Sequence, residues 1–191
     1  MRSFKKIAIT GHTSGIGLNL FEVFSANGHE VTGYSRSAGS DIENPEARKQ
    51  IIDEIADYDI FINNAYSPNG QTMLLRELVA HWNGQPKKII NVSSKLSFFE
   101  LGKIDVLDDY IKQKSQQNEI VQQRFSAAYP QIMNVIIGLV DTPMSTMFQS
   151  PKLDPRTLSE FIYNMTVVDD LYIQQIIVDV PGLDWKNIKG P

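Results

Sequence analysis

The chain has 191 residues, of which 42% are hydrophobic and 21% are charged, a size and composition that suit one globular domain. The formal net charge of -4, with lysine and arginine scattered along the chain, predicts that it binds neither nucleic acid nor an anionic membrane. The absence of cysteine excludes thiol nucleophiles, thiolate metal sites and disulfides, the 3 scattered histidines predict no metal site, and the short apolar runs predict a cytoplasmic protein.

Short apolar runs alternate with segments of helical periodicity along the chain. The first run is residues 6–10 (KIAIT), which Ile16, Leu20 and Phe24 follow at helical spacing before a second run at 29–34. Later runs lie at 58–63, 87–93, 131–140 and 172–180, and later helical segments lie at 51–55, 74–79, 110–128 and 158–165. This alternation predicts a doubly wound α/β fold over residues 1–191, with a mostly parallel sheet of about six to seven strands and helices on both faces.

One connection is too short for this pattern. Only residues 37–40 separate Arg36 from Asp41, where a doubly wound nucleotide-binding fold has a helix and a third strand. We therefore predict that the helix is missing and that the strand is lost or reduced to a stub. A helix that begins near Asn44-Pro45 would then lead to the strand that holds Asn63.

Residues 9–17 read ITGHTSGIG, a glycine-rich turn between a strand and a helix. Such a turn exposes backbone N–H groups and the positive end of a helix dipole, where a pyrophosphate can bind. Gly11 would allow the tight turn, Gly15 the approach of the phosphates and Gly17 the packing of helix on strand. The spacing alone is also that of an ordinary strand-to-helix turn.

The segment TGHTSGIG at 10–17 resembles the T-G-x3-G-x-G cofactor loop of the short-chain dehydrogenase/reductase family. Similar landmarks of that family follow in order at Asp41-Ile42, Asn63-Asn64-Ala65, Asn91-Val92-Ser93-Ser94, Tyr110 with Lys114, and Gly138 to Met144. The resemblance implies a Rossmann fold that binds NAD(P). It also implies an oxidoreductase that moves a hydride between the nicotinamide and a small carbonyl compound or secondary alcohol.

The resemblance implies these cofactor contacts: Gly11, Thr13, Ser14, Gly15, Ile16, Gly17, Ser35, Arg36, Asp41, Ile42, Asn63, Asn64, Ala65, Tyr110, Lys114 and Thr142. The second strand ends at Ser35, where an acidic residue would bind the ribose 2'-hydroxyl of NAD, and Arg36 suits the 2'-phosphate of NADP. We expect a preference for NADP(H), with NAD(H) possible. His12 would either contact the same phosphate or be a solvated loop residue.

The resemblance assigns the proton transfer to Tyr110. A free tyrosine, with a pKa of about 10, needs a nearby cation to act as a base, and Lys114 lies one helical turn further on the same face. Ser94, with Ser93 as the competing residue, would bind the substrate oxygen. Asn69 would complete the catalytic set, although it fits a simple turn equally well.

Several positions depart from the family pattern. Tyr66 replaces a glycine, where it would either crowd the pocket or swing over it, and Ile137 replaces a proline. The interval 95–109 is longer than usual. Met144, Met147 and Phe148 would form either a short substrate flap or a cover for the core. These departures keep open a second function, a catalytically impaired NADP(H)-binding sensor or scaffold module.

Two further expectations rest on the resemblance. Subunits of this family pair through the helices that correspond to 70–82 and 110–128, so we expect a homodimer or tetramer. Leu74, Leu78, Ile120 and Val121 on these helices suit core packing equally well. A sugar-nucleotide epimerase of the extended branch would need a larger substrate domain than residues 143–191 provide, and we rank it last.

Overall fold

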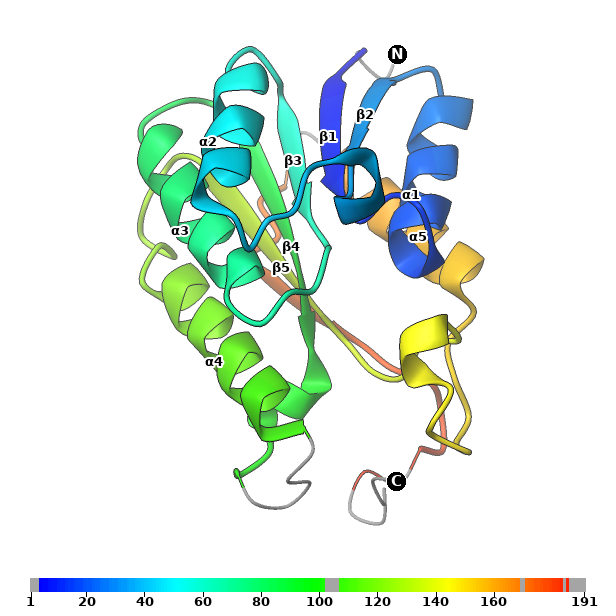
Figure 1. Cartoon of the computed structure of the whole chain (residues 1–191). Coiled ribbons are helices and arrows are strands. Elements are labelled where there is room, and N and C mark those ends of the chain that lie inside the picture. The colour runs from blue at the N-terminus through cyan, green and yellow to red at the C-terminus, as the bar shows by residue number, and fades with distance from the viewer. Residues whose placement is uncertain (1–3, 102–106, 169–170, 184, 186–191) are drawn as a thin grey trace.

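The computed structural model describes residues 4–101, 107–168, 171–183 and 185. Its strands form one sheet in the order β2-β1-β3-β4-β5-β6, and each pair of neighbours is parallel (Figure 1). The strands are β1 (Lys6–Thr10), β2 (Glu30–Tyr34), β3 (Ile60–Asn63), β4 (Lys88–Ser94), β5 (Gln131–Ile137) and β6 (Gln175–Val178). The predicted doubly wound α/β fold is confirmed.

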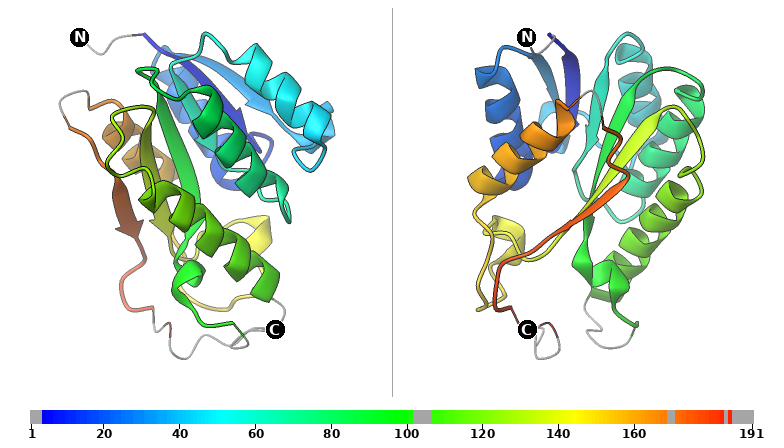
Figure 2. Two further views of the ribbon diagram at one scale, coloured as in Figure 1. Left: turned by 90° about the vertical axis from the view of Figure 1, so that its left-hand side faces the viewer. Right: turned by 180° about the vertical axis from the view of Figure 1, so that it is seen from behind.

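Helices cover both faces of the sheet. They are α1 (Gly15–Ala26), α2 (Pro45–Glu54), α3 (Gly70–His81), α4 (Asp108–Gln122) and α5 (Pro155–Thr166). Figures 1 and 2 show α1 and α5 on one face and α2, α3 and α4 on the other. The helix expected to run to residue 128 stops at Gln122, because residues 123–128 make the turn that returns the chain to β5.

Alternation along the strands supplies an apolar core to each face. In β1, Ile7 and Ile9 pack in one buried cluster together with Leu20 of α1. Ala8 lies between them in sequence and packs in the opposite cluster, with Leu74 of α3. Because both faces are covered, the strands carry nearly continuous apolar runs, as is typical of parallel sheets.

The connection after β2 is as short as the sequence predicts. A single 3-10 turn, η1 (Arg36–Ala38), lies between β2 and α2, and β2 is therefore an edge strand of the sheet. The next residues are held by the buried Arg48 of α2, whose Nη1 donates to the carbonyls of Ile42 (3.0 Å) and Glu43 (3.1 Å). Its Nε donates to Glu77 of α3 at 3.0 Å. The shortened segment is thus fixed to two helices.

Two absences hold for the described residues. In that part of the chain no helix combines the length and apolar character needed to cross a membrane. Nor does it contain a group of three or more His, Asp or Glu side chains arranged to hold a metal ion.

Core packing of α3 can be tested by truncating Leu74, which is fully buried. We expect Leu74→Ala to lower the free energy of unfolding by about 2–5 kcal/mol, because it leaves a cavity against the sheet. Leu18→Ala is the control, because Leu18 of α1 is 38% exposed. It should change the free energy of unfolding by less than about 0.5 kcal/mol. Urea unfolding followed by circular dichroism measures both values, and equal losses would show that Leu74 is not a core residue.

Candidate functional site

The glycine loop forms a cradle of backbone between β1 and α1. Gly11 (φ +75°) and Gly15 (φ +54°) adopt left-handed conformations that favour glycine. The N–H of Gly11 donates to the carbonyl of Tyr34 at 2.7 Å, which fixes the loop to β2. A side chain at Gly17 would collide with the carbonyl of Gly11, so α1 packs closely on the loop.

Segments that follow three different strands meet at this loop. The Thr10 hydroxyl accepts the backbone N–H groups of Asn64 (3.0 Å) and Ala65 (3.1 Å), and Asn64 Nδ2 donates to the Thr10 carbonyl at 3.0 Å. The Thr142 methyl group lies 3.2 Å from where a Cβ on Gly15 would stand. The ends of β1, β3 and β5 therefore converge at the edge where open α/β sheets bind ligands.

The end of β2 presents Arg36 to this edge. Ser35 is buried, and its hydroxyl accepts the N–H of Ala38 (3.2 Å) and pairs with the Ser37 hydroxyl (3.1 Å). Arg36 is exposed, and no carboxylate of the described residues lies within ion-pair distance of its guanidinium. The Arg36 side chain is therefore available to an anion.

His12 is packed rather than solvated. Its ring lies against Gly33, where an added Cβ would collide with it, and its centroid is 5.5 Å from that of Phe21. Its Nδ1 is buried and has no hydrogen-bond partner among the described residues. The expectation of a solvated loop histidine is therefore wrong, because the ring fills the space above the side-chain-free position in β2.

Ser94, Tyr110 and Lys114 come together where β4 ends and α4 begins. Ser94 is the last residue of β4, and Tyr110 lies in the first turn of α4. Burial raises the pKa of Tyr110 to about 12, although a hydrogen bond with Ser94 lowers it. The Tyr110 hydroxyl is consequently protonated at neutral pH.

Lys114 is buried, with 3% of its surface exposed. Its Nζ donates to Gln71 Oε1 at 2.7 Å and to the Val92 carbonyl at 2.9 Å, and it lies 5.5 Å from the centroid of the Tyr110 ring. Burial lowers the pKa of Lys114 to about 7. Its amino group therefore changes charge near neutral pH, next to the tyrosine.

The two adjacent serines have different surroundings. Ser93 is buried and donates to Asn118 Oδ1 at 2.8 Å, so its hydroxyl is engaged within the core. Ser94 bonds with Tyr110 and accepts the N–H of Leu96 at 3.2 Å. The geometry favours Ser94 over Ser93 as the partner of Tyr110.

Asn69 does not lie with this group. It is exposed before α3, its N–H donates to Glu43 Oε1 at 2.8 Å, and no hydrogen bond within the described residues joins it to Lys114. Gln71, fully buried two residues later, contacts the lysine instead. Gln71 was not among the residues predicted from the sequence, although its place on the apolar face of the helix with Leu74 and Leu78 was a readable signal.

Two expected cofactor contacts have buried side chains. Asn63 is fully buried and donates to Asn91 Oδ1 at 3.0 Å. Ile42 packs in the cluster beneath α2 and α3. Because both side chains belong to the core, a cofactor contact from either residue would come from its backbone, and the contact itself stays a prediction.

Two departures from the family pattern, Tyr66 and the segment after β5, can be placed in the structure. The Tyr66 ring, 36% exposed, packs against the Tyr110 ring at 5.0 Å between centroids and a tilt of 57°, and thus crowds the site. After β5, the 3-10 turn η4 (Pro143–Ser145) begins a flap on which Met144 is 57% exposed while Phe148 is buried. Phe148 therefore covers the core, and a substrate flap at Met144 and Met147 stays a prediction. Of the interval 95–109, residues 102–106 lie outside the described residues.

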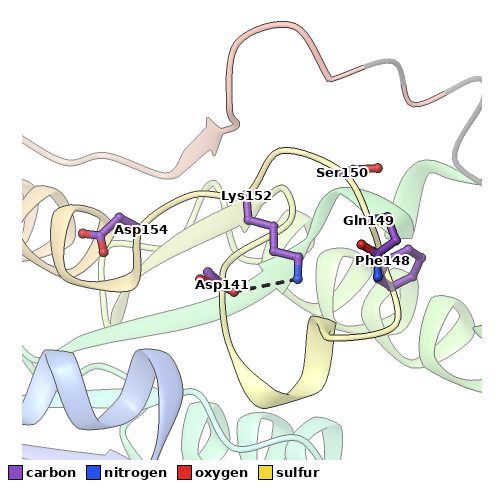
Figure 3. A pocket seen from close by; sticks show the side chains of 6 residues that line it. All are labelled: Asp141, Phe148, Gln149, Ser150, Lys152 and Asp154. Atoms are coloured by element: carbon purple, nitrogen blue, oxygen red, sulfur yellow. Dashed lines mark ion pairs between the residues drawn. The ribbon is translucent and has the colours of Figure 1, made fainter.

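An open cavity of about 440 Å³ lies on the same flap, apart from Tyr110 (Figure 3). Lys152 points across it toward Asp141, at 3.7 Å between charged atoms. Its lining is Asp141, Phe148, Gln149, Ser150, Lys152 and Asp154. Because this lining includes none of the candidate catalytic residues, the cavity is not the site described above.

No protein-family model and no curated protein matches the chain. Solved structures do match it. A short-chain dehydrogenase from Burkholderia cenocepacia in complex with NADP gives a TM-score of 0.76 at 20% identity, covering 93% of this chain and 89% of that one. The 3-alpha-hydroxysteroid dehydrogenase from Pseudomonas sp. complexed with NADH gives 0.69 at 17% identity, covering 91% and 95%. A short-chain dehydrogenase from Sphingobium yanoikuyae in complex with NADPH gives 0.70 at 16% identity, covering 95% and 89%.

The chain therefore has the fold of the short-chain dehydrogenases/reductases, as its motifs imply. These matches cover most of both chains, although the structure lacks the helix and strand that a doubly wound nucleotide fold has after its second strand.

The burial of Lys114 predicts a pH-dependent stability. Its pKa falls from 10.5 to about 7 on folding, so between these values the unfolded chain binds a proton that the folded chain has lost. The contribution of Lys114 to stability therefore rises with pH across this window. We expect the free energy of unfolding of Lys114→Met, relative to that of wild type, to be highest at about pH 7 and below. This advantage in stability should be lost toward about pH 10.

Urea unfolding of both proteins across this window measures the difference. Lys112→Met, which changes an exposed lysine on the same helix, is the control and should show no such dependence. A difference between Lys114→Met and wild type that does not change with pH would contradict the burial of a charged amino group.

Proposed function

We propose that the chain is an NADP(H)-dependent oxidoreductase of the short-chain dehydrogenase/reductase family. It would transfer a hydride between the nicotinamide and a small carbonyl compound or secondary alcohol. The observation that carries the proposal is the meeting of Ser94, Tyr110 and Lys114 at the end of β4, on the same edge of the parallel sheet as the glycine loop. The cofactors named for the structures of similar fold, NADP, NADPH and NADH, support it.

The residues at the sheet edge suit a dinucleotide. The glycine loop offers backbone N–H groups at the start of the 12-residue helix α1, where a pyrophosphate binds well. Arg36, which has no ion-pair partner among the described residues, would bind the 2'-phosphate. Thr142 faces the loop and would hold the nicotinamide carboxamide. When bound, the nicotinamide supplies or accepts the hydride.

The side chains of this site can move the accompanying proton. Tyr110 would donate its hydroxyl proton to the carbonyl oxygen, and Ser94 would hydrogen-bond the same oxygen as negative charge develops on it. A protonated Lys114 would stabilise the phenolate left on Tyr110. Because Tyr110 is protonated at neutral pH, it can supply the proton that carbonyl reduction requires.

A second candidate function is a binding module that has lost turnover. The packing of the Tyr66 ring against the Tyr110 ring favours it, since Tyr66 takes up space beside the reacting residue. Such a module would bind NADP(H) and give no turnover that depends on Tyr110.

Replacing the tyrosine separates the two functions. We expect Tyr110→Phe to reduce NADPH oxidation on a panel of aldehydes and ketones by roughly 10²- to 10⁴-fold while NADPH binding persists, because only the proton donor is lost. Tyr129→Phe, at a site that is 40% exposed and outside the candidate group, is the control. Turnover that survives in Tyr110→Phe would refute the assigned role, and a wild-type chain that binds NADPH without turnover would favour the module.

Arg36 determines the choice of cofactor in this proposal. We expect Arg36→Gln to weaken NADPH binding by about tenfold or more and to leave NADH binding unchanged, because only NADPH carries the phosphate. Calorimetric titration measures both affinities, with Arg76→Gln on the exposed face of α3 as the control. An equal loss for both cofactors would show that Arg36 does not read the 2'-phosphate.

A further inference from the structure

Three asparagines lie side by side across the sheet. Asn63, Asn91 and Asn134 are in register on β3, β4 and β5, and each is fully buried. Asn63 Nδ2 donates to Asn91 Oδ1 at 3.0 Å, and Asn91 Nδ2 donates to Asn134 Oδ1 at 2.9 Å. Each link therefore fixes the orientation of the next amide.

One end of this amide chain leads to Ser94. Asn134 Nδ2 donates at 2.9 Å to Asn118 Oδ1, which lies one helical turn beyond Lys114. Asn118 Nδ2 donates to the Ser97 hydroxyl at 2.7 Å, and that hydroxyl donates to the Ser94 carbonyl at 2.6 Å. The amide chain therefore ends on the backbone of a candidate catalytic residue.

The other end leads to Lys114 through Gln71. Asn63 Nδ2 also donates to the Gln71 carbonyl at 3.2 Å. Gln71 Nε2 donates to the carbonyls of Asn63 (3.0 Å) and Val92 (3.3 Å). Because its amino group faces two carbonyls, its oxygen is turned to Lys114 Nζ, 2.7 Å away.

The environment of Lys114 makes this contact important. Among the described residues, Lys114 Nζ donates to Gln71 Oε1 and to the Val92 carbonyl, and Tyr110 is the one titratable side chain that these contacts place beside it. A buried ammonium is costly unless its hydrogen bonds are made. Loss of the Gln71 oxygen would leave the buried charge with a single acceptor.

We propose that Gln71 is a positioning residue, which holds the Lys114 amino group beside Tyr110 and favours its protonated form. The amide chain fixes Gln71 at one end and the Ser94 backbone at the other. The importance of Gln71 for catalysis rests on the proposed function. Its effect on the charge of Lys114 does not, because that charge can be measured in the protein without cofactor.

The test is an NMR pH titration of the cofactor-free full chain labelled with ¹³C-lysine, with the Lys114 ε-CH₂ signal assigned by its loss in Lys114→Met. In wild type we expect a midpoint of about 7. In Gln71→Met the midpoint should fall by about one pH unit or more, because an acceptor of the charged form is removed. Gln71→Glu should raise it, because a carboxylate then lies beside the ammonium, so a fold defect in one variant cannot hide the effect.

Gln117→Met is the matched control. Gln117 is also a fully buried glutamine between α3 and α4, but its Nε2 donates to Thr72 Oγ1 at 3.3 Å, and no hydrogen bond among the described residues joins it to Lys114. An unchanged midpoint in both Gln71 variants, or an equal fall in Gln71→Met and Gln117→Met, would overturn the proposal. The titration needs no substrate, so its failure is distinguishable from a failure to find turnover. In an active enzyme, the fall of carbonyl reduction with rising pH should move to lower pH in Gln71→Met.

Discussion

An amino group buried between a sheet and two helices must find hydrogen-bond acceptors at fixed places, and Lys114 of α4 finds them on α3 and β4. Both hydrogen bonds of Lys114 therefore depend on how α3 and α4 pack on β4. The buried asparagines on β3, β4 and β5 favour one strand register, because a shift by one residue would turn each amide to the other face. The polar layer beneath the site and the site itself are therefore parts of one arrangement, and apolar clusters on both faces of the sheet offset its cost.

The shortened connection after β2 leaves this arrangement intact. The missing helix and strand would lie beyond β2, at the edge of the sheet, whereas the candidate residues follow β1 to β5. Arg48 compensates locally by holding the Ile42 and Glu43 carbonyls against α2 and α3. A short chain can thus keep the whole edge at which a dinucleotide would bind. The shortened connection changes the surroundings of Arg36, which lies in a single 3-10 turn between β2 and α2.

The elements and the glycine loop could be predicted because their signals are local: apolar periodicity, glycine spacing and a tyrosine and lysine one turn apart. The partner of Lys114 could not, because Gln71 and Lys114 are 43 residues apart in sequence and their contact depends on how α3 packs on α4. Asn69 fits the catalytic set and a simple turn equally well, because its neighbours in sequence do not distinguish the two. Asn118 and Asn134 gave no local pattern at all, since a lone polar residue on a helix or strand becomes meaningful only beside its partner.

The central claim is that the edge formed by the glycine loop, Arg36, Thr142 and Tyr110 is one dinucleotide site. A crystal structure of the chain grown with NADP⁺ tests it most directly. The account predicts the pyrophosphate on the backbone of the loop between Gly11 and Gly17, the 2'-phosphate at Arg36, and the nicotinamide between Thr142 and Tyr110. A cofactor bound elsewhere, or a chain that takes up none at saturating concentration, would contradict the account.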